Sequence, residues 1–168
     1  MQYVEDHTLY HINCMSDFNL YSQFKIGDVI DTSRNYNPFR NNYEIGSTSL
    51  NYAEECAKTY WRFTKEFAIE QTRSQINEDL PSRWRSLWLS DKEHLDYWKS
   101  QFVNEEFQIV KLNLNGKIFL GDAHWIEIEP SPLLVVREKA INYWTGNIFR
   151  GGKMEYLFEG IAKVVSLV

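Results

Sequence analysis

The sequence predicts an α+β fold, with helices outside a mostly antiparallel sheet. Segments with strand character outnumber those that a simple alternation of strands and helices would need. The pair Asn115-Gly116 is typical of a hairpin turn, which joins antiparallel neighbours. The length of 168 residues fits one hydrophobic core, so we expect a single domain over 1–168.

The amino-terminal part is expected to hold two strands and a long loop. Residues 8–13 suit a short strand, and residues 16–23 suit one helical turn. Residues 24–31 indicate a turn beside a second strand. Residues 32–50 are rich in Asn, Ser, Gly and Tyr, which predicts a loop. Long loops in small domains are often functional.

The clearest predicted element is an amphipathic helix that begins at a cap on Asn51 and runs to about Ile76. Charged residues occupy one face of this helix. Apolar residues recur every three or four positions on the other face: Ala53, Cys56, Ala57, Tyr60, Phe63, Phe67 and Ala68. We interpret the helix as a scaffold that packs on the core.

The middle of the chain predicts three strands and one helix. Alternation around Leu87 and Leu89 indicates a half-buried strand, followed by a helix over 91–102. Residues 106–116 are the strongest strand signal. We expect the chain to turn at Asn115-Gly116 and to return as a partner strand over 117–125.

The carboxyl-terminal part predicts a helix and a closing strand region. Residues 133–146 suit a helix that Gly146 ends. Residues 151–168 indicate one or two strands divided at Gly160. This order places the last sheet segment after all the helices.

The composition excludes several broad classes of protein. The net charge of −5 argues against general binding of polyanions. Cys14 and Cys56 lie far apart, so we expect neither a disulfide framework nor a metal site. The start of the chain has no long apolar run, and no window approaches the roughly 20 apolar residues of a membrane span. We therefore expect a soluble, cytoplasmic protein without membrane contact.

Familiar catalytic motifs are missing from the sequence. Residues 24–31 and 150–153 lack the glycine spacing of a P-loop or a dinucleotide-binding loop. No HExxH or G-x-S-x-G motif occurs. These absences argue against a metalloprotease, a P-loop ATPase and an ordinary serine hydrolase.

Candidate chemical groups occur in three places. Asp122, at the end of the strand over 117–125, begins a stretch crowded with ionisable residues. His11 lies inside the strand over 8–13, where a packed core histidine is the usual alternative. Arg83 and Arg85 alternate with tryptophans, an arrangement that binds phosphate and stacks rings, or forms surface ion pairs. Taken singly, each group has an ordinary structural explanation.

Taken together, the motifs resemble the ADP-ribosyltransferase superfamily, and more closely a bacterial domain family of unknown function within it. The likeness covers nearly the whole chain and rests on LYHIN, FKIGDVI, LPSRWRSLWLSD, IVKLNLNGKIFLGDAHWIE, INYWTG and EYLFEGIAKVV. FKIGDVI with its Asn- and Tyr-containing loop also resembles rifampin ADP-ribosyltransferases. The resemblance implies a split antiparallel sheet with flanking helices and NAD+ as co-substrate.

The resemblance also implies roles for individual residues. His11, in LYHIN, corresponds to a strand histidine that holds the adenosine-side ribose of NAD+. Trp88 stands where a tyrosine is usual, so it can stack on nicotinamide but lacks the phenol. Asn35 and Tyr36, in the loop, are expected to contact the cofactor. These assignments predict that segments distant in sequence meet at one site.

The third motif of the family is an acid, for which the sequence offers two choices. We prefer Asp122, at the strand end. The alternative is the E-x-E pair formed by Glu127 and Glu129, in which Glu129 would act on the ribose. Arg83 or Arg85 would pair with the pyrophosphate. Glu155 and Glu159, on the last strand, are interpreted as structural.

The chemistry explains why an acid is needed. Breaking the bond between nicotinamide and ribose builds positive charge on the ribose, as in glycoside hydrolysis. A carboxylate stabilises that charge more than it stabilises NAD+ itself, which lowers the barrier.

The resemblance therefore predicts an NAD+-dependent mono-ADP-ribosyltransferase acting on a macromolecule, either an RNA or other nucleic-acid base or a protein side chain. Small free-standing members include toxins of toxin–antitoxin or phage-defence systems, for which an antitoxin protein would be a partner. The alternatives are a non-catalytic binding module and an NAD+ hydrolase toxin on the same fold.

Overall fold

Among the described residues, the sheet has five strands, and the pairings between these strands are all antiparallel. The computed structural model describes residues 1–15, 23–34, 53–102 and 105–168. The strands in chain order are β1 (Gln2–Cys14), β2 (Val29–Asp31), β3 (Leu87–Leu89), β4 (Phe107–Asp122) and β5 (Met154–Leu167). β4 pairs with β1 on one side and β5 on the other, and β5 also pairs with β2 and β3.

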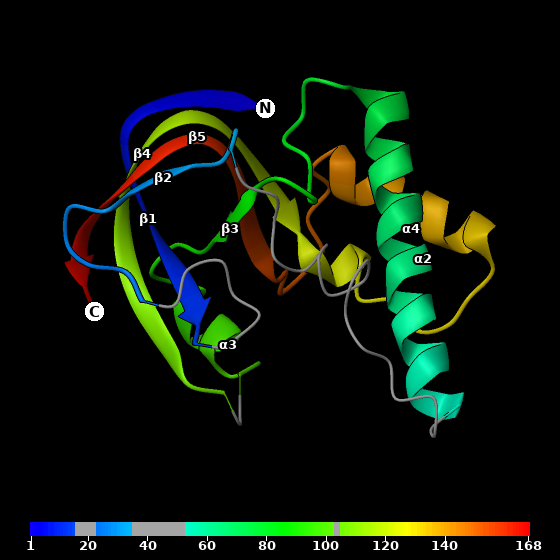
Figure 1. The fold of residues 1–168 in the computed structure, drawn as a ribbon. Coiled ribbons are helices and arrows are strands. Elements are labelled where there is room, and N and C mark those ends of the chain that lie inside the picture. The colour runs from blue at the N-terminus through cyan, green and yellow to red at the C-terminus, as the bar shows by residue number, and fades with distance from the viewer. Residues whose placement is uncertain (16–22, 35–52, 103–104) are drawn as a thin grey trace.

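The sheet curls until β1, at one edge, lies beside β3 at the other (Figure 1). Ser90, directly after β3, bridges to Tyr10 of β1 through two backbone hydrogen bonds of 2.8 Å. Alternate residues of the long strands point to opposite faces of the sheet. One face lines the inside of the curl, and the other faces the helices.

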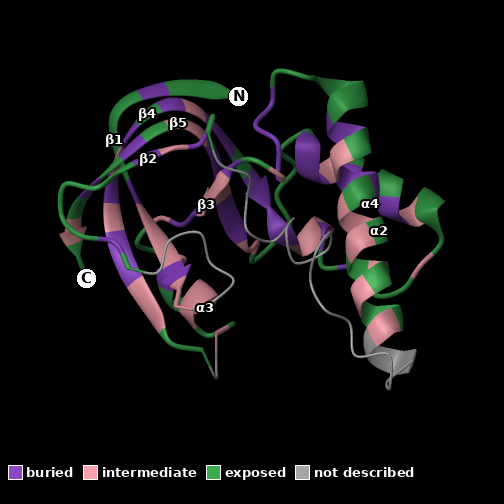
Figure 2. Ribbon diagram, in the orientation of Figure 1, coloured by how far each residue is buried: buried purple, intermediate pink, exposed green. Residues whose placement is uncertain are grey.

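Two hydrophobic clusters fill these environments (Figure 2). The first lies inside the curl and includes Leu9, Val110, Leu112, Leu114, Phe158 and Val164. The second lies between the sheet and the helices and includes Ile69, Phe119, Val136, Tyr143, Trp144 and Leu157. Neighbours such as Leu157 and Phe158 are thus both fully buried, in different clusters.

The helices lie mainly on the outer face of the sheet. α2 (Ala53–Ile76) and α4 (Leu133–Trp144) pack against each other there (Figure 1). α3 (Leu95–Lys99) is a short helix that contacts β1, and η1 (Ala123–Trp125) is a 3-10 turn directly after β4. α4 ends as predicted, because Gly146 takes a φ of 75° and its N–H bonds to the carbonyl of Tyr143.

The α+β class and the antiparallel sheet are confirmed, and several elements match their predicted bounds. The helix to Ile76 and the strand at Leu87–Leu89 form as expected. β1 begins earlier than the strand predicted over 8–13, and α3 is shorter than the helix predicted over 91–102. β5 runs unbroken through Gly160.

The predicted hairpin at Asn115-Gly116 is wrong. β4 continues through both residues, and Gly116 lies opposite Gly160 of β5. A Cβ atom at either glycine would collide with the backbone of the other strand. These glycines therefore permit a close approach of two strands instead of a turn.

The resemblance implied a split antiparallel sheet, and the described strands share one antiparallel sheet. Three predictions lie wholly or largely outside the described residues: the helical turn over 16–23, most of the loop over 32–50, and the cap at Asn51. In the part of the chain that the structure describes, none of the helices has the length and apolar character that crossing a membrane requires.

Candidate functional site

Two segments far apart in the chain meet where the curled sheet closes. His11 of β1 donates a 2.9 Å hydrogen bond from Nδ1 to the carbonyl oxygen of Trp88 in β3, 77 residues later. The ring of Phe24 lies edge-on to the imidazole, with 6.1 Å between the ring centroids. Because a carbonyl oxygen only accepts, Nδ1 carries the proton and Nε2 keeps a lone pair in the neutral ring.

Burial sets the charge of His11. Loss of solvent lowers the pKa of the imidazole below its ordinary value, and the hydrogen bond to Trp88 offsets only part of this effect. His11 is therefore neutral at pH 7. It offers hydrogen bonds to a ligand, without a positive charge.

A second set of polar groups adjoins this contact. Asp91 follows Ser90, and its Oδ1 accepts hydrogen bonds from the backbone N–H of His94 at 2.9 Å and from the imidazole Nδ1 at 2.8 Å. Its Oδ2 accepts a hydrogen bond of 3.2 Å from the hydroxyl of Tyr156. We use the name β1–β3 site for the group His11, Trp88, Asp91, His94 and Tyr156.

These hydrogen bonds determine the charges in the β1–β3 site. Burial alone would raise the pKa of Asp91, but the bonds from His94 and Tyr156 bring it below its ordinary value. Burial and the Asp91 carboxylate raise the pKa of Tyr156 to about 12. Asp91 is thus an anion and Tyr156 a phenol at neutral pH. The side chains of Asp91 and His94 remain 28% and 25% exposed, so a ligand in solvent can reach them.

A hollow of about 550 Å³ opens beside Tyr156. Its wall is mostly apolar and includes Val4, Ile118 and Trp144. This volume falls within the range of small-molecule sites in proteins. Tyr156 connects the hollow to the β1–β3 site, because the residue lines the wall and its hydroxyl bonds to Asp91.

Arg83 lies in the interior, where protein groups engage its guanidinium. Nη1 donates to the carboxylate of Glu155 and, at 3.0 Å, to the hydroxyl of Tyr143. Nε donates to Glu66 of α2 at 2.9 Å. Burial alone would lower the pKa of Arg83, but the two carboxylates raise it well above its ordinary value. These contacts fix the start of β5 to both long helices.

The contacts of Arg83 bear on two cofactor roles that the resemblance implied. The Arg83 side chain is 4% exposed and bonded to two carboxylates, whereas Arg85, the other arginine predicted to pair with a pyrophosphate, lies at the surface. The Arg85 side chain is 54% exposed and lies 3.6 Å from Glu159. Arg83 also lies over the Trp88 indole, 4.6 Å from its centroid, and therefore occupies one stacking face of that ring.

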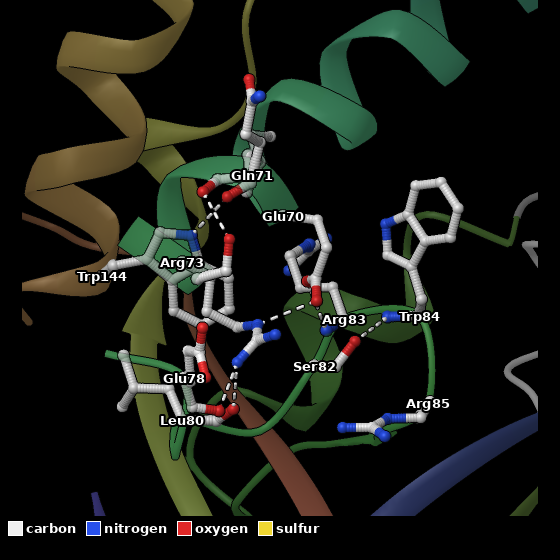
Figure 3. A network of polar contacts seen from close by, with 12 residues as sticks. Glu70, Gln71, Arg73, Glu78, Leu80, Ser82, Arg83, Trp84, Arg85 and Trp144 are labelled. Atoms are coloured by element: carbon white, nitrogen blue, oxygen red, sulfur yellow. Dashed lines mark hydrogen bonds and ion pairs between the residues drawn. The ribbon is translucent and has the colours of Figure 1, made fainter. Parts of the chain in front are cut away.

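A related network holds the turn that leads to Arg83 (Figure 3). Arg73 of α2 bonds to Glu70 at 2.8 Å and to the carbonyl oxygens of Glu78 and Leu80 at 2.7 and 2.8 Å. Figure 3 shows Arg73 reaching from the helix to this turn, with Glu70 between Arg73 and Arg83. These contacts position the chain for its entry into β3.

Asp122, the predicted catalytic acid, makes its contacts inside the fold. The side chain is fully buried, and its two oxygens accept backbone hydrogen bonds from His124 (3.0 Å), Phe149 (2.7 Å) and Lys153 (2.8 Å). Gly152 packs so closely that a Cβ atom there would collide with the carboxylate. Asp122 therefore ties the chain before β5 to the end of β4. It also lies at the opposite end of β4 from Val110, the register partner of His11.

The alternative acids occupy the protein surface. Glu127 accepts a 2.9 Å hydrogen bond from the Tyr97 hydroxyl and forms an ion pair with Lys153. Glu129 is exposed, and its carboxylate makes no hydrogen bond or ion pair with the described residues. Neither glutamate contacts the β1–β3 site. The remaining predicted contacts, Asn35 and Tyr36, lie outside the described residues.

Sequence reasoning found two members of the β1–β3 site and missed three. Asp91 and His94 lie in the helix predicted over 91–102, and Tyr156 lies in the predicted closing strand region, so none of the three stands out in the sequence as a candidate for chemistry. The spacing of Asp91 and His94, three residues apart at a helix start, is a signal that a carboxylate orients an imidazole. Across the described ranges, no three His, Cys, Asp or Glu residues gather as metal ligands would.

Two comparisons with known proteins complete the description of the site. The model of a family described as "Protein of unknown function (DUF2441)" matches residues 9–168. The match includes every residue of the β1–β3 site. A search of curated proteins finds no match.

Proposed function

Because the chain belongs to the family described as "Protein of unknown function (DUF2441)", we propose its function from its own side chains. The function is NAD+-dependent transfer of ADP-ribose to a macromolecule, at the β1–β3 site. The supporting observation is the 2.9 Å hydrogen bond between His11 and the carbonyl of Trp88. It joins LYHIN and LPSRWRSLWLSD, two of the motifs that carry the resemblance to ADP-ribosyltransferases.

The charges of the site suit this chemistry. Neutral His11 offers a hydrogen bond to a ribose hydroxyl without repelling the positive nicotinamide ring. Tyr156 lines the hollow and is the aromatic residue that would stack on the co-substrate, whereas one face of Trp88 is covered by Arg83. Arg85, at the surface, pairs with the pyrophosphate.

The reaction also needs an ionised carboxylate near the ribose, and Asp91 is the residue that fits. It is partly exposed, its pKa lies below the ordinary value, and it follows Ser90, which is bridged to β1. A carboxylate held in place by hydrogen bonds needs no reorganisation as positive charge develops on the ribose. Asp122 does not share these features because it is fully buried. Glu129 does not share them because it is exposed and its carboxylate is not held by hydrogen bonds from the described residues.

The test is incubation of the purified protein with labelled NAD+ and a cell lysate, with the RNA, DNA and protein fractions counted separately. We expect label in one fraction and its loss, on the order of 100-fold, in His11→Ala, because a misplaced co-substrate reacts poorly. His124→Ala is the matched control, since His124 is a partly exposed histidine that belongs neither to the β1–β3 site nor to the wall of the hollow. Circular dichroism verifies that both variants fold.

The other outcomes of this incubation are equally informative. Release of free nicotinamide without label in any fraction would identify an NAD+ hydrolase. Equal labelling by His11→Ala and wild type would remove the β1–β3 site from the reaction. Complete lack of NAD+ turnover would reject the transferase.

A non-catalytic binding module is the second candidate, and one observation favours it. The acid that the resemblance implied, Asp122, is fully buried and bonded to three backbone N–H groups. A protein that retains the fold but has lost the reactive acid would show this arrangement. Binding of a partner by a chain that binds neither NAD+ nor ADP-ribose in calorimetry would establish it.

A further inference from the structure

The β1–β3 site contains an imidazole held in the orientation of a general base. Because Oδ1 of Asp91 accepts the Nδ1–H of His94 at 2.8 Å, the lone pair of the neutral ring lies on Nε2. Within the described ranges, Nε2 makes no hydrogen bond. The side chain is 25% exposed, so an acceptor group can reach this atom.

Resting on the proposed function, we infer that His94 is the general base that deprotonates the acceptor, and that the acceptor is a serine or threonine hydroxyl of a protein. A hydroxyl is a weak nucleophile until an adjacent base takes its proton. An imidazole beside a carboxylate supplies such a base, because the carboxylate stabilises the imidazolium that forms.

Besides its proposed role at the ribose, Asp91 positions His94, because both of its carboxylate oxygens are held by hydrogen bonds. Its Oδ1 also receives the backbone N–H of His94 at 2.9 Å, and its Oδ2 receives the hydroxyl of Tyr156 at 3.2 Å. The carboxylate is thereby fixed from β5 and from the start of α3. A fixed carboxylate holds the imidazole in one tautomer and one orientation.

The charges around His94 favour a protein acceptor over RNA. Glu93 and Asp96 lie beside Lys92 and Lys99, so the described residues form no basic patch around the imidazole. The whole chain carries a net charge of −5. RNA binding depends strongly on neutralising phosphates, which this surface does not do.

The step balances as a single displacement. The bond between the ribose C1′ and the nicotinamide nitrogen breaks, and its electron pair leaves with neutral nicotinamide. The hydroxyl oxygen of the acceptor bonds to C1′, and its proton passes to Nε2 of His94. The imidazolium then returns this proton to solvent, so NAD+ and an alcohol give the ADP-ribosyl O-glycoside, nicotinamide and a proton.

The test compares wild type, His94→Gln and Asp91→Asn with labelled NAD+ and a serine-containing peptide, an otherwise identical alanine peptide, and single-stranded RNA. Calorimetry measures NAD+ binding by each protein. His124→Gln is the matched control, because His124 is a partly exposed histidine outside the β1–β3 site that stacks on Phe149. We expect label on the serine peptide alone and a fall in transfer of about 100-fold or more in His94→Gln. The affinity of His94→Gln for NAD+ should stay within about twofold of wild type, because a base that acts only on the acceptor does not contribute to NAD+ binding.

A second measurement separates a base from a structural side chain. His94→Ala should regain part of its transfer activity when free imidazole is added, which a purely structural loss would not allow. If the wild-type protein labels the peptide and His94→Gln labels it equally well, the role of His94 as the base is overturned and the proposed transferase function stands. Label on RNA alone would overturn the proposal that the acceptor is a serine or threonine hydroxyl of a protein. A wild-type protein that neither binds nor consumes NAD+ would reject the proposed function and this inference together.

Discussion

Arg83 and Glu155 form an ion pair in the interior, with their side chains only 4% and 7% exposed. The pair joins the turn before β3 to the second residue of β5, and Glu66 and Tyr143 complete it from the two long helices. One guanidinium therefore joins the turn before β3, the strand β5 and the helices α2 and α4. Removing one partner of such a pair leaves an uncompensated charge in the interior.

We predict that Arg83→Met lowers the free energy of unfolding by about 3–5 kcal/mol, because it strands two carboxylates. Arg85→Met is the control, and its exposed ion pair should change the value by less than about 0.5 kcal/mol. Urea unfolding measures both. Combining Arg83→Met with Glu155→Gln should recover part of the loss, and equal effects of the two arginine variants would contradict the prediction.

Asp122→Ala should destabilise the protein by about 3 kcal/mol or more, because three backbone N–H groups lose their only bonded carboxylate in a fully buried position. Glu129→Ala, at the surface, should leave the stability unchanged within about 0.5 kcal/mol. Thermal and chemical unfolding test this difference. A stable Asp122→Ala protein that has lost NAD+ turnover would restore Asp122 as the catalytic acid.

Gly116→Ala should cost more than about 2 kcal/mol, since its methyl group would meet the backbone of β5 at Gly160. Gly146→Ala supplies the comparison. Its φ is 75° and nothing lies near its Cβ position, so only backbone strain of about 1 kcal/mol opposes the methyl group. Chemical unfolding of the two variants separates collision from strain. A similar cost at both positions would argue against the close approach of β4 and β5.

The stability of the protein should fall as the pH drops below about 6.5, in part because of His11. Burial lowers the pKa of its folded-state imidazole, so the unfolded chain binds a proton first as acid is added. Between the folded and unfolded pKa values, stability therefore rises with pH. His11→Gln should weaken this dependence between pH 7 and pH 5 in urea unfolding, with His7→Gln as the companion variant on the same strand. An identical pH slope in wild type and His11→Gln would refute the assignment.

The sequence predicted correctly those elements that are determined by residues close together in the chain. The helix to Ile76 follows from the spacing of its apolar residues, and the end of α4 follows from Gly146. Asn115-Gly116 misled because the same pair permits either a tight turn or a close approach of strands. The choice depends on Gly160, more than forty residues later.

The site was only partly visible in the sequence for a similar reason. The role of Asp122 depends on backbone groups at Phe149 and Lys153, which reach it only because the chain folds back before β5. The pairing of Asp91 with His94 is local, but its link to Tyr156 crosses 65 residues. The meeting of His11 with Trp88 was implied by the resemblance, and no local pattern predicts it.

The position of β5 in the sheet has a consequence for folding during synthesis. β5 pairs with β2, β3 and β4, yet it leaves the ribosome after all three. Until residue 154 has emerged, the described strands have only the pairing of β1 with β4 and the short bridge to Ser90 available. Completion of the sheet is therefore a late event dominated by contacts distant in sequence, which fold slowly. A nascent chain halted before β5 would expose the apolar face of β4, and chaperone binding should concentrate at that stage.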